Sequence, residues 1–527
     1  MTETAADTTR TGGVVPTALE AAVTTTDHLR IGRAWLASGA LLLVASLVAG
    51  LLVSVERMDL TGMAVFGDVD SLFRFWSAYR VGLVLLVVVP VFVGLATAVV
   101  PLQVGASSIV FPRAAALGFW VWALGAAFTV AGFVIDGGLG TPGAVSRTDA
   151  LALTLLGLLM VIGGICCATV CILTTIVAGR TAGMNLSRVP LFAWSVLVAG
   201  SIWLVTLPVL AANTVLIYVD LTGRSAVAFG VEDTIWGQLS WAFSHPQVYA
   251  FALPLVGIAG DIVPVAARRR HGNHRALLVL TALIGVLSFG AYAQAAFDIG
   301  TPIREQAIFV VEAFLIVPLV LLVLVGLVDV LRRGVGSRRT RMPAPLYLSV
   351  LSVLFLLDGT VLGALRAVAP LDLLDRSTTG AQFTFTIGAA LLAAMAGTLW
   401  WGDLIVGRVV PQGFGLASAL AVAVGIVLIA VPDTISGFMG LADFTGGDLV
   451  GAGNPGSGVD VLNTVALVGS AHLLVGALGW LVTGVLRLRG ARSLADPWGG
   501  HTLEWSTSPV EVTSESPLLD ATVEVGA

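Results

Sequence analysis

Long apolar stretches recur through the whole chain, and they constrain its fold more than any other feature. A helix that spans a bilayer needs about 20 apolar residues. Charged residues make up only 11% of the 527 residues, whereas soluble domains carry roughly 25%. We therefore predict an all-α integral membrane protein with twelve transmembrane helices. The twelve segments are 35–54, 81–100, 114–135, 150–178, 191–218, 234–264, 276–297, 307–331, 346–365, 380–406, 413–432 and 462–486.

The basic residues indicate which side of the membrane each loop faces. All 27 are arginines, and the chain contains no lysine. With the N-terminus in the cytoplasm and the twelve segments alternating, nineteen arginines fall on the cytoplasmic side and eight on the other. Cytoplasmic loops carry the excess of positive charge in membrane proteins. We therefore expect a multi-pass protein of the plasma membrane with both termini in the cytoplasm.

Polar segments flank the apolar region. Residues 1–27 are rich in Thr and Ala and lack a secretory cleavage pattern, so we predict a disordered cytoplasmic tail there. We assign 28–490 to one membrane domain and 491–527 to a cytoplasmic C-terminal tail. The lipid bilayer is the main partner that this division implies, and we expect no nucleic-acid partner.

Five passages in register resemble subunit I of the haem-copper oxidases, the cytochrome c oxidase family. The resemblance runs in order through most of the chain and agrees with the number of apolar segments. It implies that the twelve helices adopt the arrangement of that subunit. The passages are TTTDHLRIGRAWL (24–36), VVPLQVGASSIVFPR (99–113), RVPLFAWSVLVAGSIWLVTLPVLAANTVLIYVD (188–220), IWGQLSWAFSHPQVYAFALPLVGI (235–258) and DPWGGHTLEWSTSP (496–509).

The resemblance implies a chemistry that this chain lacks the residues to perform. In the family, six helix-borne histidines hold a low-spin haem and a haem–copper pair, because imidazole is a good donor for iron and copper. This chain has six histidines in all, but only His245 and His472 fall within apolar segments. No histidine lies between 28 and 245 or between 274 and 472, so three of the ligand-bearing helices cannot supply one in any register.

The resemblance implies which residues stand at the family's ligand positions, and spacing from Pro90 and Pro101 places Tyr79 at that of the low-spin haem. Among the six, His245 alone remains as a candidate metal ligand, and Tyr249 matches the tyrosine that family members cross-link to a copper histidine. The family's buried Glu is replaced by Gln247, its proton-entry Asp by Ser108 and its channel Lys by Leu322, while Asp375 stays near the external magnesium position. The resemblance further implies that Gln382 and Thr384 replace two haem ligands, and that Gln294 and Ala295 replace two adjacent copper histidines.

Several polar residues lie within the apolar segments and have two interpretations. Ionisable groups in a membrane are costly and are often functional, which makes Glu312, Asp358 and Asp403 candidates. In the functional interpretation, Glu312 pairs with Gln294 or Gln382 across the space that a haem would fill. We favour the alternative, in which these polar groups join neighbouring helices through hydrogen bonds, and we expect Asp403, near a cytoplasmic end, to reach water. For His245 and His472 we favour helix packing over metal ligation. The three cysteines are interpreted as small packing residues: Cys166, Cys167 and Cys171.

Three functions remain open. The leading hypothesis is a non-catalytic subunit I homologue, free of haem and copper, that acts as a structural or accessory subunit beside other membrane subunits of a respiratory-type complex. The second is a working terminal oxidase, which would oxidise cytochrome c, reduce oxygen and translocate protons with haem and copper held by unusual ligands. The third is a proton or small-molecule pathway that uses Glu312 and Asp358.

Overall fold

The structure is a computed structural model of the whole chain. It describes residues 23–58, 65–140, 148–224, 235–290, 303–334, 343–374, 376–443, 457–494, 496–500 and 502–506. Within these ranges the chain is helical and forms no strand, which confirms the predicted all-α membrane fold.

Among the described residues, eleven helices are long and apolar enough to cross a membrane. They match eleven of the twelve predicted segments. The remaining segment, 276–297, begins as the shorter apolar helix α11, and its residues from 291 lie outside the described part. The long helices and their pieces are α2 (His28–Glu56), α3 (Val69–Val81), η1 (Gly82–Val88), α4 (Val89–Val104), α5 (Pro112–Val134), α6 (Thr148–Ala178), α7 (Leu191–Leu221), α9 (Gln247–Ala252), α10 (Pro254–Ala266), α11 (His274–Val286), α12 (Ile303–Gly334), α13 (Ala344–Arg366), α14 (Thr378–Trp400), α16 (Gln412–Phe438) and α17 (Ser457–Arg487).

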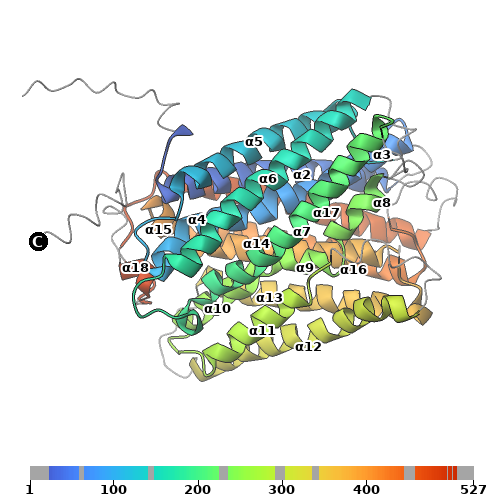
Figure 1. The fold of residues 1–527 in the computed structure, drawn as a ribbon. Helices are drawn as coiled ribbons and strands as arrows, with labels where there is room; N and C mark the ends of the chain where they lie inside the picture. Colours follow the sequence, from blue (N-terminus) through green and yellow to red (C-terminus); the bar gives the residue numbers. More distant parts are fainter. Residues whose placement is uncertain are drawn as a thin grey trace, which may run out of the picture.

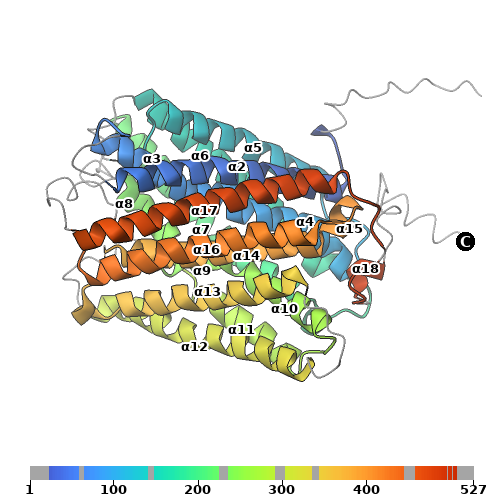
Figure 2. The same ribbon diagram turned by 180° about the vertical axis from the view of Figure 1, so that it is seen from behind.

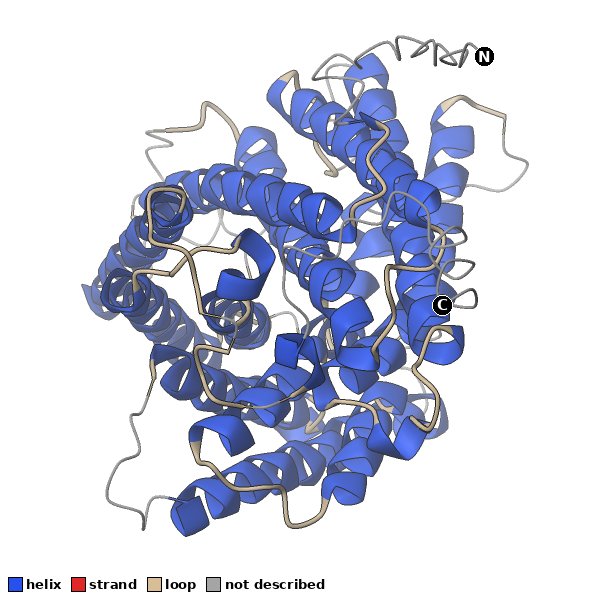
Figure 3. Ribbon diagram, turned by 90° about the vertical axis from the view of Figure 1, so that its left-hand side faces the viewer, coloured by secondary structure: helices blue, strands red, loops and turns tan. Residues whose placement is uncertain are grey.

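The helices run side by side along one axis (Figures 1 and 2). Helices α5 and α6 form one edge of the bundle, and α11 and α12 form the opposite edge. A view along the axis shows the helices in curved rows (Figure 3). Short helices lie at the ends: α8 (Ile235–Leu239) near the start of α3, and α15 (Gly402–Val406) and α18 (Leu503–Ser506) at the opposite end.

Side-chain caps fix where several helices begin. Asp27 accepts hydrogen bonds from the amides of Leu29 and Arg30 at the start of α2, and Asp68 accepts one from Ser71 at the start of α3. These acceptors satisfy amides that have no partner inside the helix. Helix α7 begins after Pro190 and receives its cap from another helix, as described below.

The second span begins twelve residues before the predicted start. It runs from Val69 to Val104 as α3, η1 and α4. Its first piece, α3, carries Asp70, Arg74 and Arg80, which lower the local hydropathy and hide the helix from an apolar count. The middle piece η1 is a π-helix, in which Val89 donates its amide five residues back to Val84.

The segment after α17 folds back onto the end of the bundle. The Trp498 indole stacks on Trp400 with ring centroids 4.4 Å apart, and its nitrogen donates to the Trp400 carbonyl at 3.0 Å. Ser493 donates to the Asp403 carboxylate at 3.0 Å. The chain from Ser493 to Trp505 therefore packs against the ends of helices that precede it by about a hundred residues or more.

Helices α5 and α6 approach one another through glycine. A Cβ at Gly164 would lie 2.6 Å from the Gly118 carbonyl oxygen and 2.6 Å from the Trp122 amide nitrogen. A Cβ at the neighbouring Gly163 would meet nothing within 4 Å. Small residues at such contacts let transmembrane backbones come close enough for dense van der Waals packing.

This contrast predicts opposite outcomes for two adjacent substitutions. Gly164→Ala should lower the Tm of the purified protein in detergent, because overpacking a tight contact costs about 1–3 kcal/mol. Gly163→Ala should leave the Tm unchanged or raise it, because alanine is the better helix former. Equal Tm values for the two variants would contradict the close α5–α6 contact.

Candidate functional site

Two residues at predicted haem-ligand positions face the same interior space. Tyr79 on α3 and Thr384 on α14 both line a cavity of about 60 Å³ and a second one of about 20 Å³. A buried water needs roughly 10–15 Å³ by this measure, whereas pockets for organic ligands span about 300–1,000 Å³. These cavities therefore have room for a few water molecules and not for a porphyrin.

The Tyr79 side chain itself occupies part of this region. Its ring lies against Gly50 of α2, where a Cβ would come within 2.6 Å of the ring edge. The phenol thus replaces an imidazole and also packs against the neighbouring helix. His472 on α17 does not line either cavity, and its ring bonds to the Val468 carbonyl of its own helix at 2.8 Å.

Two buried ion pairs line the larger cavity. The Arg57 guanidinium lies 2.6 Å from Asp433 on α16, and that of Arg80 lies 3.1 Å from Asp443. The side chains of Arg80 and Asp443 are only 6% and 9% exposed. Arg80 also lies over the ring of Trp76 at 4.4 Å, a cation–π contact. Both arginines therefore pair with carboxylates of this chain.

A second set of buried polar residues, joined by hydrogen bonds, lies at the predicted catalytic centre. Gln382 donates to the Tyr249 hydroxyl at 2.6 Å, and that hydroxyl donates to the Gly359 carbonyl at 3.1 Å. The Arg366 guanidinium donates to the Gln382 side-chain oxygen. Gln382 stands where the family has a haem ligand, and both ends of its amide are engaged. Sequence reasoning identified Tyr249 and Gln382 but missed Arg366, whose partner lies on the next helix.

His245 is buried and lies next to these hydrogen-bonded residues. Its ring meets Tyr249 edge-on at a centroid distance of 5.3 Å and Phe309 of α12 at 4.7 Å. A Cβ at Gly363 of α13 would collide with the Tyr249 hydroxyl and approach the His245 ring to 3.3 Å. The imidazole is thus held by aromatic packing and by the absence of a side chain at position 363.

Two family proton positions are occupied by neutral groups. Gln247 donates to the Thr206 hydroxyl at 3.1 Å and accepts from the Gly290 amide at 3.1 Å, so its amide is fully engaged. Leu322 is 52% exposed and faces outward, which contradicts its assignment to an inward-facing channel position. The buried positions beside it on α12 are Val320 and Val323. The register was misjudged because α12 is apolar on all sides.

The buried carboxylates differ in their surroundings. Glu312 is buried on α12, and Asp358 is half-buried on α13. The proposed pairing of Glu312 with Gln382 is wrong, because among the described residues Gln382 bonds to Tyr249 and Arg366. Asp403, expected near water, is buried and accepts from the Val410 amide and Ser493. Burial raises the pKa of this carboxyl.

A half-buried carboxylate on α10 was not identified from the sequence. Asp261 on α10 accepts hydrogen bonds from the amides of Leu191 and Phe192 at 2.9 and 3.1 Å, and from the Gln103 side chain at 2.9 Å. The Asp261 carboxylate therefore caps the start of α7 from a different helix. The positive end of the α7 dipole stabilises its negative charge. Its only sequence signal is a single carboxylate in an apolar segment.

Other predicted residues take no part in these clusters or lie outside the described residues. Cys166 and Cys167 are partly buried and Cys171 is buried, all three as free thiols on α6, in keeping with a packing role. Ser108 lies in the turn between α4 and α5. The positions outside the described part are Gln294, Ala295, Asp375 and His501.

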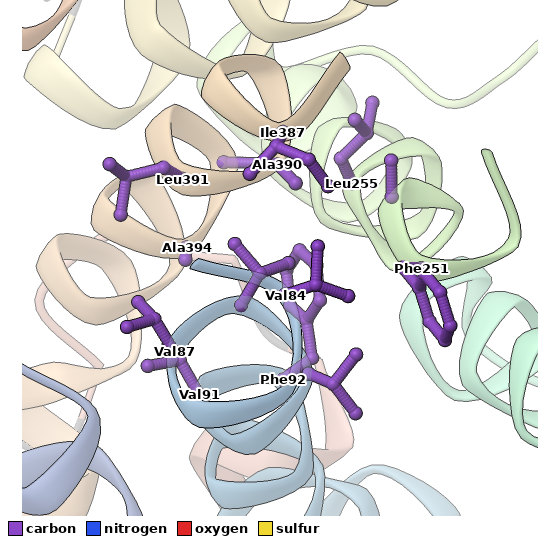
Figure 4. Close-up of a cluster of buried hydrophobic side chains, with 14 of the residues drawn as sticks. Val84, Val87, Val91, Phe92, Phe251, Leu255, Ile387, Ala390, Leu391 and Ala394 are labelled. Atoms are coloured by element: carbon purple, nitrogen blue, oxygen red, sulfur yellow. The ribbon is translucent and has the colours of Figure 1, made fainter. Parts of the chain in front are cut away.

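The described side chains at the predicted haem-ligand positions do not fit haem, because they are a phenol, a carboxamide and a hydroxyl and not imidazoles. Within the described ranges, no group of three or more His, Cys, Asp or Glu side chains could hold a metal ion. Apolar side chains fill the interface of η1 and α4 with α9, α10 and α14 (Figure 4), including Val84, Phe92 and Leu391, each at most 4% exposed. Buried apolar side chains thus occupy this interface.

Comparison with known proteins identifies the class. A family model described as cytochrome c and quinol oxidase polypeptide I matches residues 30–471. A probable cytochrome c oxidase subunit 1-beta of Nocardia farcinica is 28% identical over 514 residues, which cover 92% of this chain and 84% of the relative. For the cytochrome c oxidase subunit 1 of Bacillus subtilis, the identity is 27% over 503 residues, with 92% and 79% covered.

The fold agrees with these sequence matches. A haem-copper terminal oxidase dimer solved by cryo-EM superimposes with a TM-score of 0.73 at 15% identity, covering 94% of this chain and 89% of that chain. The structure is therefore a multi-pass membrane protein with the haem-copper oxidase fold. Because the family model spans most of its length, the chain belongs to the cytochrome c and quinol oxidase polypeptide I family.

The ion pairs around Tyr79 give a test of how this interior is held together. Arg80→Gln should lower the Tm strongly, because removing one partner of a buried pair costs about 3–5 kcal/mol. Arg333→Gln is the matched control, since the Arg333–Asp329 pair is exposed and such pairs contribute about 0–1 kcal/mol. Thermal unfolding of both variants in detergent measures the difference. Similar Tm values would show that Asp443 does not depend on Arg80.

Proposed function

We propose that this chain is a non-catalytic member of its family, which binds neither haem nor copper and serves as a structural or accessory subunit of a respiratory-type membrane complex. The oxidase fold positions the helices, but function depends on the residues at the site. At the positions assigned to metal ligands, the described residues offer a single imidazole, that of His245, beside a phenol, a hydroxyl and a carboxamide.

The observation that carries the proposal is the engagement of Gln382. Its amide joins Tyr249 to Arg366, so the side chain at a haem-ligand position is part of a polar chain internal to the protein. A buried guanidinium close to His245 also disfavours a further cation there. The network thus supports a Gln382 side chain that is satisfied by protein groups without a metal.

The partners and location follow from the relatives. The relatives from Nocardia farcinica and Bacillus subtilis are named as subunit 1 of cytochrome c oxidase, which implies assembly with further subunits. We propose that this chain lies in the plasma membrane, with both termini in the cytoplasm, and associates with other membrane subunits. The start of α2 and helix α18 lie at one end of the bundle, in keeping with termini on one side.

Optical and metal analysis of the purified full-length protein tests the cofactor proposal. We expect no haem band in the reduced-minus-oxidised spectrum, no haem stain on a gel and less than about 0.1 copper or iron per chain by elemental mass spectrometry. An authentic oxidase subunit I prepared from the same host is the positive control. Stoichiometric haem in this chain, with the control loaded normally, would establish the working-oxidase alternative.

A transport measurement separates the remaining alternative. Proteoliposomes of the wild-type protein should show no proton flux above that of protein-free vesicles. Flux that disappears in Glu312→Gln but persists in Asp358→Asn would replace the structural proposal with a proton pathway through α12.

The proposed role of Gln382 predicts a stability effect. Gln382→Leu should lower the Tm, since it removes the acceptor of Arg366 and the donor to Tyr249, at about 1–3 kcal/mol for each buried group left unsatisfied. Thr384→Val, two residues along α14 and without a hydrogen bond to Arg366 or Tyr249, is the control and should have little effect. A stable Gln382→Leu protein would contradict the structural role of the amide.

A further inference from the structure

An apolar groove runs along the membrane-facing side of the bundle, between α2, the second span and α5. Its volume is about 180 Å³, the largest of the three cavities described here. The lining residues on α2 extend from Leu42 to Ala49, and those on the second span extend from Arg74 to Leu86. At 1.5 Å per residue these stretches are roughly 10 and 18 Å long, so the groove follows the direction of a lipid chain.

Small side chains create the groove. Ala45 and Ala49 on α2 face Ala78 and Gly82 on the second span, and Phe133 of α5 closes the opposite wall. A Cβ at Gly82 would collide with the Ser46 hydroxyl, so the helices already touch at the floor. The space above this contact is left open by residues that are too short to fill it.

The chemistry of the walls selects an apolar occupant. Apart from Arg74 and the Ser46 hydroxyl, the lining is aliphatic or aromatic. Apolar cavities of about 150 Å³ stay dry and take up hydrocarbons, and a dry void is costly because its walls lack contact partners. An acyl chain of the surrounding bilayer is apolar and supplies the contact partners that the walls of an empty groove lack.

Charged groups lie at the end of the groove where α3 begins. The Arg74 guanidinium pairs with Asp136, which follows α5, and lies 5.6 Å from the centre of the Phe75 ring. The Nε of Arg74 is buried and has no hydrogen-bond partner among the described residues. Asp68 and Asp70 also lie at this end and are exposed. Asp70 interacts electrostatically with Asp68 and Asp136, so among the described residues three carboxylates cluster beside the Arg74–Asp136 pair.

We propose that the groove binds one phospholipid with an amine-bearing zwitterionic headgroup, of the phosphatidylethanolamine type. The acyl chain lies between α2, η1 and α5, the phosphate contacts Arg74, and the ammonium group contacts Asp136 and its acidic neighbours. A purely anionic headgroup meets the excess of carboxylates and is disfavoured. The site is formed by helix ends outside the region of the family's metal positions and does not depend on the proposed loss of catalysis.

Native mass spectrometry of the delipidated full-length protein tests this site. We would titrate it with dioleoyl phosphatidylethanolamine and, separately, with dioleoyl phosphatidylglycerol. We expect one phosphatidylethanolamine per chain, bound at least about ten-fold more tightly than phosphatidylglycerol. Equal binding of the two lipids, or no lipid held above the non-specific background, would overturn the proposal.

Matched variants locate the bound lipid. Ala45→Phe, which fills the groove, should weaken phosphatidylethanolamine binding at least about five-fold, whereas Leu41→Phe adds the same ring on α2 outside the groove and should not. Asp136→Asn leaves the groove intact and should reduce the preference over phosphatidylglycerol to less than about three-fold. Arg376→Gln, in the ion pair with Asp372 at the same end of the bundle, should leave the preference unchanged. Unaltered binding in both Ala45→Phe and Asp136→Asn would place the lipid elsewhere and refute the assignment.

Discussion

A polar group inside a membrane protein must find its hydrogen-bond partner within the protein, because the hydrocarbon core supplies none. This constraint explains why the substitutions in this chain come as interacting sets. Tyr249, Gln382 and Arg366 satisfy one another across three helices. Arg57 and Arg80 are neutralised by Asp433 and Asp443. A polar group left alone at any of these positions would destabilise the bundle.

The same constraint reconciles an oxidase fold with an altered interior. Membrane helices pack through shape as well as through polar contacts, and the surface that joins α5 to α6 does not involve the predicted metal positions. The fold therefore persists at 15% identity to a solved oxidase, while the interior facing Tyr79 and Thr384 is filled by protein side chains.

The sequence predicted the fold well because its strongest signal, apolar length, is local. It misplaced the start of the second span, where Asp70, Arg74 and Arg80 interrupt the apolar run. Counting histidines predicted, without any structure, that three ligand-bearing helices lack an imidazole, and the assignment of the individual ligand positions stays a prediction. It could not reveal Arg57–Asp433 or Arg366–Gln382, because a pairing between distant helices leaves no trace in local spacing. Asp261 was missed for the same reason: its partners lie 70 residues earlier, at the start of α7.

The return of residues 493–505 onto the end of the bundle bears on how the chain matures. Asp403 and Trp400 acquire Ser493 and Trp498 as neighbours only after α17 has been synthesised. During translation, the Asp403 carboxyl must therefore remain hydrated at the membrane surface while later helices insert. Docking of this segment is then among the final steps of biogenesis. If translation stops before this segment, the released bundle lacks the neighbours of Asp403 and Trp400.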